Sequence, residues 1–144
     1  MNLYNPERLP KIRSRKLLDE IRHMPCTLRI ASFIPSHRCA PDDTVVPCHV
    51  QTIGKGMGTK VSDLFVVAGC MACHDLLDGR DKRWTWLMDH YPAAVMHRVV
   101  RAMCETQTML MQAGILTVKG SSPVDGNYPT QIYPPPTVKG SHHE

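Results

Sequence analysis

Apolar residues recur at helical spacing near the N-terminus. Leu17, Leu18 and Ile21 form a short apolar stripe, Ser14 is a suitable N-cap before it, and Pro25 follows it. The pattern predicts a helix over residues 14–24, preceded by an extended arm over residues 1–12.

A second and longer apolar stripe lies in the C-terminal half. Val95, Val99 and Leu110 fall near helical spacing, Pro92 suits a first helical turn, and Gly114 provides a stop. A helix is therefore predicted over residues 92–112. Its methionines are expected to fill the core, and Cys104 is expected to be a buried, small apolar residue.

Between these helices the pattern changes to short apolar runs separated by turn residues. Strands are predicted over residues 44–50 and 63–68, joined by a loop at 51–62 that is rich in glycine and lysine. A short helix is predicted over 72–77, and 26–43 should be irregular. The segment from about residue 121, rich in Pro, Gly, Ser and Tyr, is expected to be a flexible tail. The chain is thus predicted to be an α+β protein with its folded domain at 13–120 and its tail at 121–144.

Charge and composition narrow the functional classes. The 144 residues carry a net charge of +4, and residues 1–40 hold eight Arg or Lys against three acidic residues. A polyanion would be attracted to such an end, but the charge taken alone is better explained by a solvated basic helix face. No run is apolar enough for a membrane span or a signal peptide, so the protein is expected in the cytoplasm of a bacterial host. Six cysteines in a reducing compartment indicate metal binding rather than disulfides.

The strongest local motif is Cys70-Met71-Ala72-Cys73-His74. Two thiolates with this spacing can grip one zinc ion, and a structural zinc takes about four ligands. Cys26 and Cys39 are the predicted second pair. His37 in place of Cys39, and Cys48 as a further ligand, remain open alternatives.

Two other functions share this motif. Cys-x-x-Cys-His is also the attachment signature of c-type haem, which normally needs export. A redox-active pair would lie near a βαβ pattern, which the sequence lacks.

A second set of residues has the chemistry of a hydrolytic site. Asp78 follows His74 by four residues, so both side chains share one helix face and can hold a divalent cation such as Mg²⁺. His49, near the end of the first strand, could accept a proton from water. Asp63 could tie down the intervening loop through hydrogen bonds. Basic residues that could reach phosphates lie on both sides of these groups: Lys55, Lys60, Arg80, Lys82 and Arg83.

This order of motifs resembles the HNH, or ββα-metal, nucleases. Residues from about 13 to 120 are more closely similar to a family of small candidate nucleases from lambdoid phages and prophages, long treated as a domain of unknown function. The matching stretches are Met24-Pro25-Cys26, Pro47-Cys48-His49-Val50, Gly56-Met57-Gly58-Thr59-Lys60, Ser62-Asp63-Leu64 and residues 70–78.

The resemblance implies an HNH-like core, stabilised by zinc and flanked by an N-terminal helix and a long C-terminal helix. It implies that His49 is the general base, that His74 binds a catalytic metal, and that Asp63 stands near the middle Asn of the motif. Cys48 departs from the family, because an acidic residue or a His that binds metal is common there, and a thiolate is a poor ligand for Mg²⁺.

Two functions follow as expectations. The first is a divalent-metal-dependent DNA endonuclease that acts in phage recombination, repair or DNA processing, with host or phage recombination proteins as possible partners. The second is a non-catalytic zinc module that binds DNA or a protein. The second needs the cysteines but not His49 or Asp78.

Overall fold

The structure is a computed structural model that describes residues 10–51, 61–122 and 124 of the chain. Its elements in chain order are α1 (Arg15–Ile21), the 3₁₀-helices η2 (Ile30–Phe33) and η3 (Asp42–Thr44), the strands β1 (Val46–His49) and β2 (Val66–Gly69), and the helices α2 (Met71–Leu77), α3 (Arg83–His90) and α4 (Pro92–Gln112). The α+β class predicted from the sequence is confirmed. No helix in these described ranges is both long and apolar enough to span a membrane.

Helix α1 begins as the sequence predicts. The Ser14 hydroxyl accepts a hydrogen bond from the Leu17 N–H at 3.2 Å, and Leu17 and Ile21 are buried. This cap satisfies one of the backbone donors that a helix start leaves unpaired. The helix ends at Ile21, three residues before the predicted end.

The two strands form an antiparallel pair in which Val46 lies opposite Gly69 and His49 opposite Val66. Both strands are shorter than predicted. Thr44, where the first strand was predicted to start, belongs to η3, and Asp63 and Leu64 form a turn before β2. The strand β2 is buried along its whole length and leads directly into α2. Strand, strand and helix therefore follow one another as the sequence predicts, and the stretch between the two strands includes residues 52–60, which lie outside the described ranges.

Gly69, on β2, packs so closely against Cys48 and Leu28 that there is no room for a side chain. A Cβ atom at this position would lie 2.7 Å from Cys48 Sγ and 3.3 Å from Leu28 Cδ2. Cys48 and Leu28 are buried, so neither can move aside freely.

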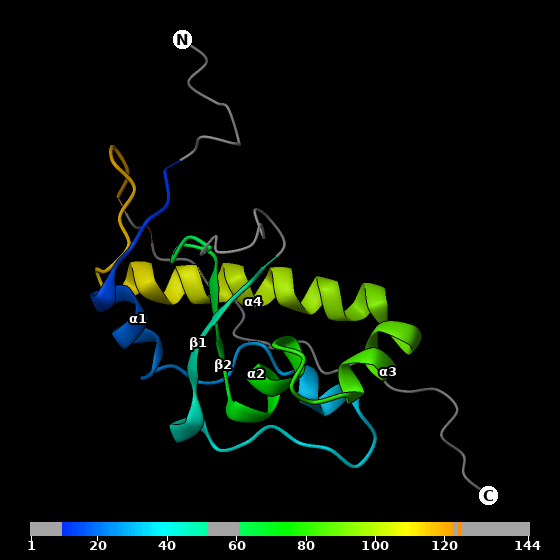
Figure 1. The fold of residues 1–144 in the computed structure, drawn as a ribbon. Helices are drawn as coiled ribbons and strands as arrows, with labels where there is room; N and C mark the ends of the chain where they lie inside the picture. The colour runs from blue at the N-terminus through cyan, green and yellow to red at the C-terminus, as the bar shows by residue number, and fades with distance from the viewer. Residues whose placement is uncertain (1–9, 52–60, 123, 125–144) are drawn as a thin grey trace, which may run out of the picture.

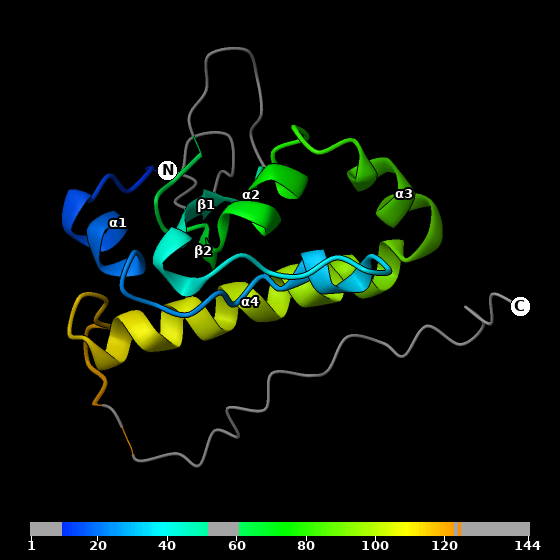
Figure 2. The ribbon, with the colours of Figure 1, turned by 90° about the horizontal axis from the view of Figure 1, so that it is seen from below.

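Helix α4 packs against β2, behind the strands in the view of Figure 1 and below them in that of Figure 2. Within it, the Thr106 hydroxyl accepts a hydrogen bond from the Ala68 N–H at 3.2 Å and lies 3.2 Å from the Thr27 hydroxyl. Its bounds match the prediction. Gly114 has φ +72°, and the Ile115 N–H bonds back to the Leu110 carbonyl at 2.9 Å, which is a Schellman stop. Cys104, expected to be buried, is exposed, because it lies out of phase with the buried stripe of this helix.

Helix α3 was not predicted. Only Leu87 is fully buried within it, so the sequence lacks a clear apolar stripe. The Asp81 carboxylate accepts a hydrogen bond from the Arg83 N–H at 3.0 Å, which is a cap-like contact at the helix start. The Trp86 and His90 rings stack one turn apart, with centroids separated by 4.4 Å. Tertiary packing and these short contacts, rather than periodicity, stabilise this helix.

Candidate metal centre and the adjoining cavity

Four cysteines from three parts of the chain meet beside α2. Cys26 lies after α1, Cys39 lies before η3, Cys70 is the N-cap of α2, and Cys73 stands in its first turn. Their sulfur atoms all lie within 4.8 Å of one another. In the described ranges they are the one group of three or more metal-binding side chains with this property.

The geometry and the donor chemistry of this cluster fit a tetrahedral metal ion. Zinc–sulfur bonds of about 2.3 Å in a tetrahedron separate neighbouring sulfurs by about 3.8 Å. Cys39 Sγ and Cys73 Sγ lie 3.7 Å apart, and all the cysteines are free rather than disulfide-bonded.

Backbone donors also point at the cluster. The Ala31 N–H donates to Cys73 Sγ at 3.4 Å, the Ala40 N–H to Cys70 Sγ at 3.3 Å, and the Cys70 N–H to Cys26 Sγ at 3.3 Å. Such N–H groups stabilise thiolates and fix the direction of a ligand. The cluster can therefore hold a metal ion such as zinc.

The pKa values of the cysteine thiols in this cluster shift in opposite directions. The pKa of Cys70 lies far below its ordinary value because Cys26, Cys39 and Cys73 hydrogen-bond to its sulfur. The pKa of Cys73 is raised because its thiol hydrogen-bonds to those of Cys26, Cys39 and Cys70 and is buried. A cation bound to the four sulfurs would displace the protons that the thiols carry.

The two alternative ligands lie elsewhere. Cys48 is buried between the strands, where its thiol donates to the Val46 carbonyl at 3.4 Å, and burial raises its pKa to about 12. His37 Nε2 lies 3.4 Å from Arg83 Nη2. Neither residue belongs to the cysteine cluster.

A cavity of about 360 Å³ adjoins the helix that carries two of the cysteines. His49 from β1, His74 from α2 and Asp78 from the end of α2 all line it. They do not make a second tight cluster of metal-binding atoms. The remaining lining residues escaped the sequence analysis as site residues: Pro47, Val50, Gln51, Leu77, Trp84, Met96 and Val99. Pro47, Val50 and Leu77 lie within the matching stretches but have no reactive group, and the others lie outside those stretches, after β1 and on α3 and α4.

His49 is held by a buried carboxylate. Its Nε2 lies 2.9 Å from Asp63 Oδ1, and the Asp63 side chain is only 7% exposed. Burial on its own would raise the pKa of Asp63, but hydrogen bonds from His49 and from the Ser14 N–H lower it below its ordinary value. The ionised carboxylate can only accept, so His49 Nε2 must carry the proton. This leaves Nδ1 as the ring nitrogen with a lone pair.

Asp63 is itself anchored by the segment before α1. The Ser14 N–H donates to Asp63 Oδ2 at 2.8 Å, and the Asp63 N–H donates to the Ile12 carbonyl at 2.9 Å. Arg13 Nη1 lies 3.9 Å from Asp63 Oδ1. Residues about 50 positions apart in the chain therefore fix the orientation of this carboxylate.

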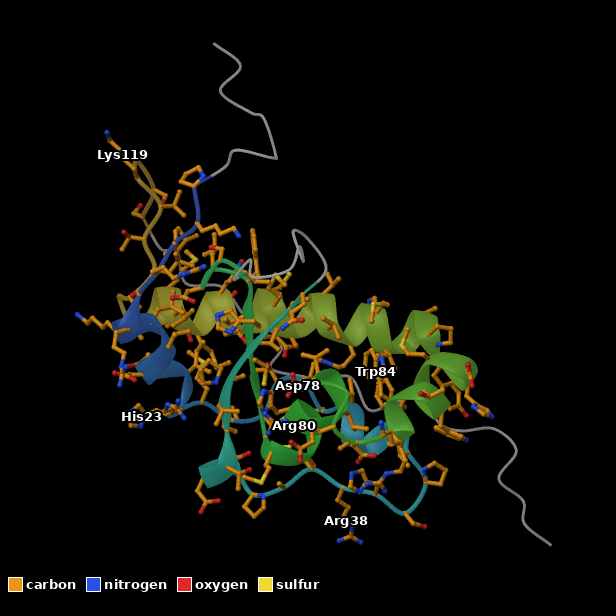
Figure 3. All side chains as sticks on the ribbon, in the orientation of Figure 1. His23, Arg38, Asp78, Arg80, Trp84 and Lys119 are labelled. Carbon is orange, nitrogen blue, oxygen red and sulfur yellow. The ribbon has the colours of Figure 1, made fainter. Side chains whose placement is uncertain are left out.

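The predicted phosphate-binding residues have different surroundings. Arg80 Nε lies 2.9 Å from Asp78 Oδ2, and Arg83 is paired with Asp81 at 2.7 Å. Lys82 is exposed. Figure 3 labels Asp78 and Arg80 at the end of α2, with Trp84 on α3. Lys55 and Lys60 lie outside the described residues.

Comparison with known proteins gives one family and one solved structure. Residues 15–115 match the family described as "Putative nuclease YbcO". The solved chain is a "putative bacteriophage protein" from Escherichia coli K-12, 22% identical, with a TM-score of 0.43; the match covers 67% of this chain and 98% of that one. The curated proteins contain no match to the chain.

Proposed function

The chain belongs to the YbcO nuclease family, and from this membership and the cavity chemistry we propose that it is a divalent-metal-dependent DNA endonuclease of the HNH type. The observation that carries the proposal is the meeting of three groups on one cavity. His49, oriented by the buried Asp63, shares the cavity with His74 and Asp78. The same helix brings two cysteines of the metal cluster.

The proposed reaction is hydrolysis of a phosphodiester. His49 Nδ1 takes a proton from water as the water oxygen attacks phosphorus. The bond from phosphorus to the leaving sugar oxygen breaks, and that oxygen takes up a proton from solvent water. The acquired proton stays on Nδ1, and the Asp63 carboxylate, which accepts the hydrogen bond from His49 Nε2 at 2.9 Å, stabilises the positive charge of the imidazolium. With the proton on Nε2, the neutral imidazole has its lone pair on Nδ1, which is the atom proposed to accept the proton.

His74 and Asp78 are the proposed ligands of the catalytic cation. One imidazole and one carboxylate leave most positions of a six-coordinate ion open to water and phosphate. Mg²⁺ or another divalent cation bound there would supply Lewis-acid stabilisation of the charge on the phosphate. Arg80 pairs with Asp78 and is 70% exposed, so it can turn from this carboxylate to a bound phosphate.

The cysteine cluster is proposed to bind a structural zinc. It joins the segment at Cys26, the segment at Cys39 and the start of α2. Since His74 follows Cys73 directly, a zinc ion would fix the helix that carries the proposed catalytic ligands. Phage recombination, repair or DNA processing is the proposed setting.

Plasmid and single-stranded DNA cleavage tests this proposal. The zinc-loaded protein is incubated with Mg²⁺ or Mn²⁺, and separately without added divalent cation. We expect cutting only with the added cation, and a loss of about 10²–10⁴-fold in His49→Ala with zinc content unchanged.

His23→Ala is the matched control. This histidine is exposed near the end of α1, apart from Asp78 in Figure 3. His23→Ala should cut at the wild-type rate. Undiminished cutting by His49→Ala would remove His49 from the mechanism, and DNA binding without cutting under both cations would favour a non-catalytic zinc module.

A further inference from the structure

The cavity has two chemically different sides. His49, His74 and Asp78 supply the polar side that the proposed reaction uses. The lining residues from α3 and α4 are all apolar and form the other side: Trp84, Met96 and Val99. The remaining apolar residues, Pro47, Val50 and Leu77, lie on or next to the elements that carry the polar groups. A phosphodiester group is charged and gains nothing from contact with apolar side chains. The part of a DNA strand that suits this side is a nucleobase.

Trp84 gives the apolar side a flat aromatic surface. It is partly buried and packs against the core while lining the cavity. The chain's other tryptophan, Trp86, is engaged elsewhere, because it stacks on His90 and makes an edge contact with Tyr91. An indole that borders a cavity can stack on a nucleobase, and such stacking does not depend strongly on which base it is.

The volume and the charge of this region suit a nucleotide. About 360 Å³ lies within the range of roughly 300–1,000 Å³ typical of small-molecule sites. Arg80 lies beside the polar side through Asp78, and Lys82 and Arg83 directly precede Trp84. Of these, the exposed Arg80 is joined to a lining residue and could turn to a phosphate beside a bound base.

We propose that the apolar side of the cavity, with Trp84 as its stacking surface, binds one unpaired nucleobase of the DNA strand whose phosphate reaches His49. This inference rests on the proposed nuclease function and names its substrate class. A base in a regular duplex is stacked and paired, so it cannot enter a cavity. The preferred substrates are therefore strands with unpaired nucleotides.

Tryptophan fluorescence tests the proposal without needing cleavage. In Trp86→Phe, Trp84 becomes the single tryptophan, and Trp86 takes no part in the cavity. The zinc-loaded variant, without Mg²⁺, is titrated with a thymidine oligonucleotide, with an abasic oligonucleotide of the same length and charge, and with a blunt duplex. We expect quenching of Trp84 by the thymidine strand, and affinity about 5- to 150-fold tighter than for the abasic strand.

Substitutions of Trp84 in the otherwise wild-type chain complete the test. Binding of the two single strands, measured by anisotropy, should become equal in Trp84→Ala, whereas Trp84→Phe should keep most of the difference. Circular dichroism and zinc content identify any variant that fails to fold, and the Phe variant then decides. Equal binding of the thymidine and abasic strands by the wild type, unchanged Trp84 emission on binding, or equal quenching by the duplex overturns the proposal.

The outcome is distinguishable from that of the nuclease proposal. If DNA is cut but the base makes no difference to binding, the nucleobase site is wrong and the nuclease proposal stands. If the base-dependent quenching is found but no cation supports cutting, the nucleobase site stands and the nuclease proposal fails.

Discussion

The substitution Asp63→Asn tests how the protein orients the imidazole in the cavity. Asn has nearly the same shape as Asp, but it is uncharged and has one acceptor oxygen. Its oxygen must face the Ser14 N–H, because that backbone donor cannot change. Its NH₂ group then faces His49 Nε2, so the imidazole has to accept at Nε2 and carry its proton on Nδ1.

The size of the effect follows from these contacts. A hydrogen bond to a charged group contributes about 1.5–3 kcal/mol and a neutral one about 0.5–1.5 kcal/mol. In Asp63→Asn, the hydrogen bonds to Ser14 and His49 change from bonds with a charged group to neutral bonds. Each change costs about 1–1.5 kcal/mol, so we expect a loss of about 2–3 kcal/mol in the free energy of unfolding. Arg13 adds little, because its side chain is 44% exposed. Cleavage should fall by about 10²–10⁴-fold, because Nδ1 no longer has its lone pair.

Urea unfolding of the zinc-loaded protein at pH 7 measures the loss of stability. Asp19→Asn is the control, since Asp19 forms an exposed pair with Arg15 on α1 and should change stability by less than about 0.5 kcal/mol. Equal unfolding free energies of Asp63→Asn and wild type at pH 7, or wild-type cleavage by Asp63→Asn, would refute the reasoning.

The same pair of proteins gives a pH dependence with a definite sign. The pKa of Asp63 is lowered in the folded protein, so its stabilising contribution is complete above the unfolded pKa of about 4 and is lost as the pH falls through the lower folded value. The difference between wild type and Asp63→Asn should therefore shrink on acidification. Protonation of the cysteines affects both proteins alike and cancels in this difference.

Other predictions concern the metal cluster and the packing between the strands. Cys39→Ser should lower bound zinc from about one ion per chain and lower the melting temperature, whereas Cys104→Ser, at an exposed position, should change neither; a metal assay with thermal unfolding checks both. Gly69→Ala should cost about 1–3 kcal/mol because its Cβ would overlap Cys48 Sγ. The double variant with Cys48→Ala should recover part of that cost in urea unfolding, and strict additivity would show that the overlap is relieved elsewhere.

The long C-terminal helix could be predicted because its signals are local. Pro92 at the start, the apolar stripe and Gly114 at the end all act within a few residues, and α4 has the predicted bounds. Helix α3 has a weaker local signal. Its cap-like Asp81 is followed by a segment in which Leu87 alone is fully buried. Periodicity therefore could not identify it.

Some contacts of the candidate site could likewise be predicted from the sequence, and others could not. The meeting of Cys26 and Cys39 with the Cys-x-x-Cys pair could be predicted because a zinc ion needs about four soft ligands. The hydrogen bond from Ser14 to Asp63 joins positions 49 residues apart, and no local pattern contains it. That long-range contact also explains why the predicted second strand starts too early, since Asp63 belongs to a turn that the N-terminal segment holds.

The shortness of α2 has a consequence for when activity can appear. A helix of seven residues is not stable by itself in water, because its few hydrogen bonds do not offset the conformational entropy lost in nucleation. Its first turn is held by the thiols that surround the metal position, and the proposed cation ligands lie on the same two turns. Under the proposed nuclease function, a newly synthesised chain would not cut the DNA around it until a metal ion had bound to the cysteine cluster, so metal supply would determine when activity begins.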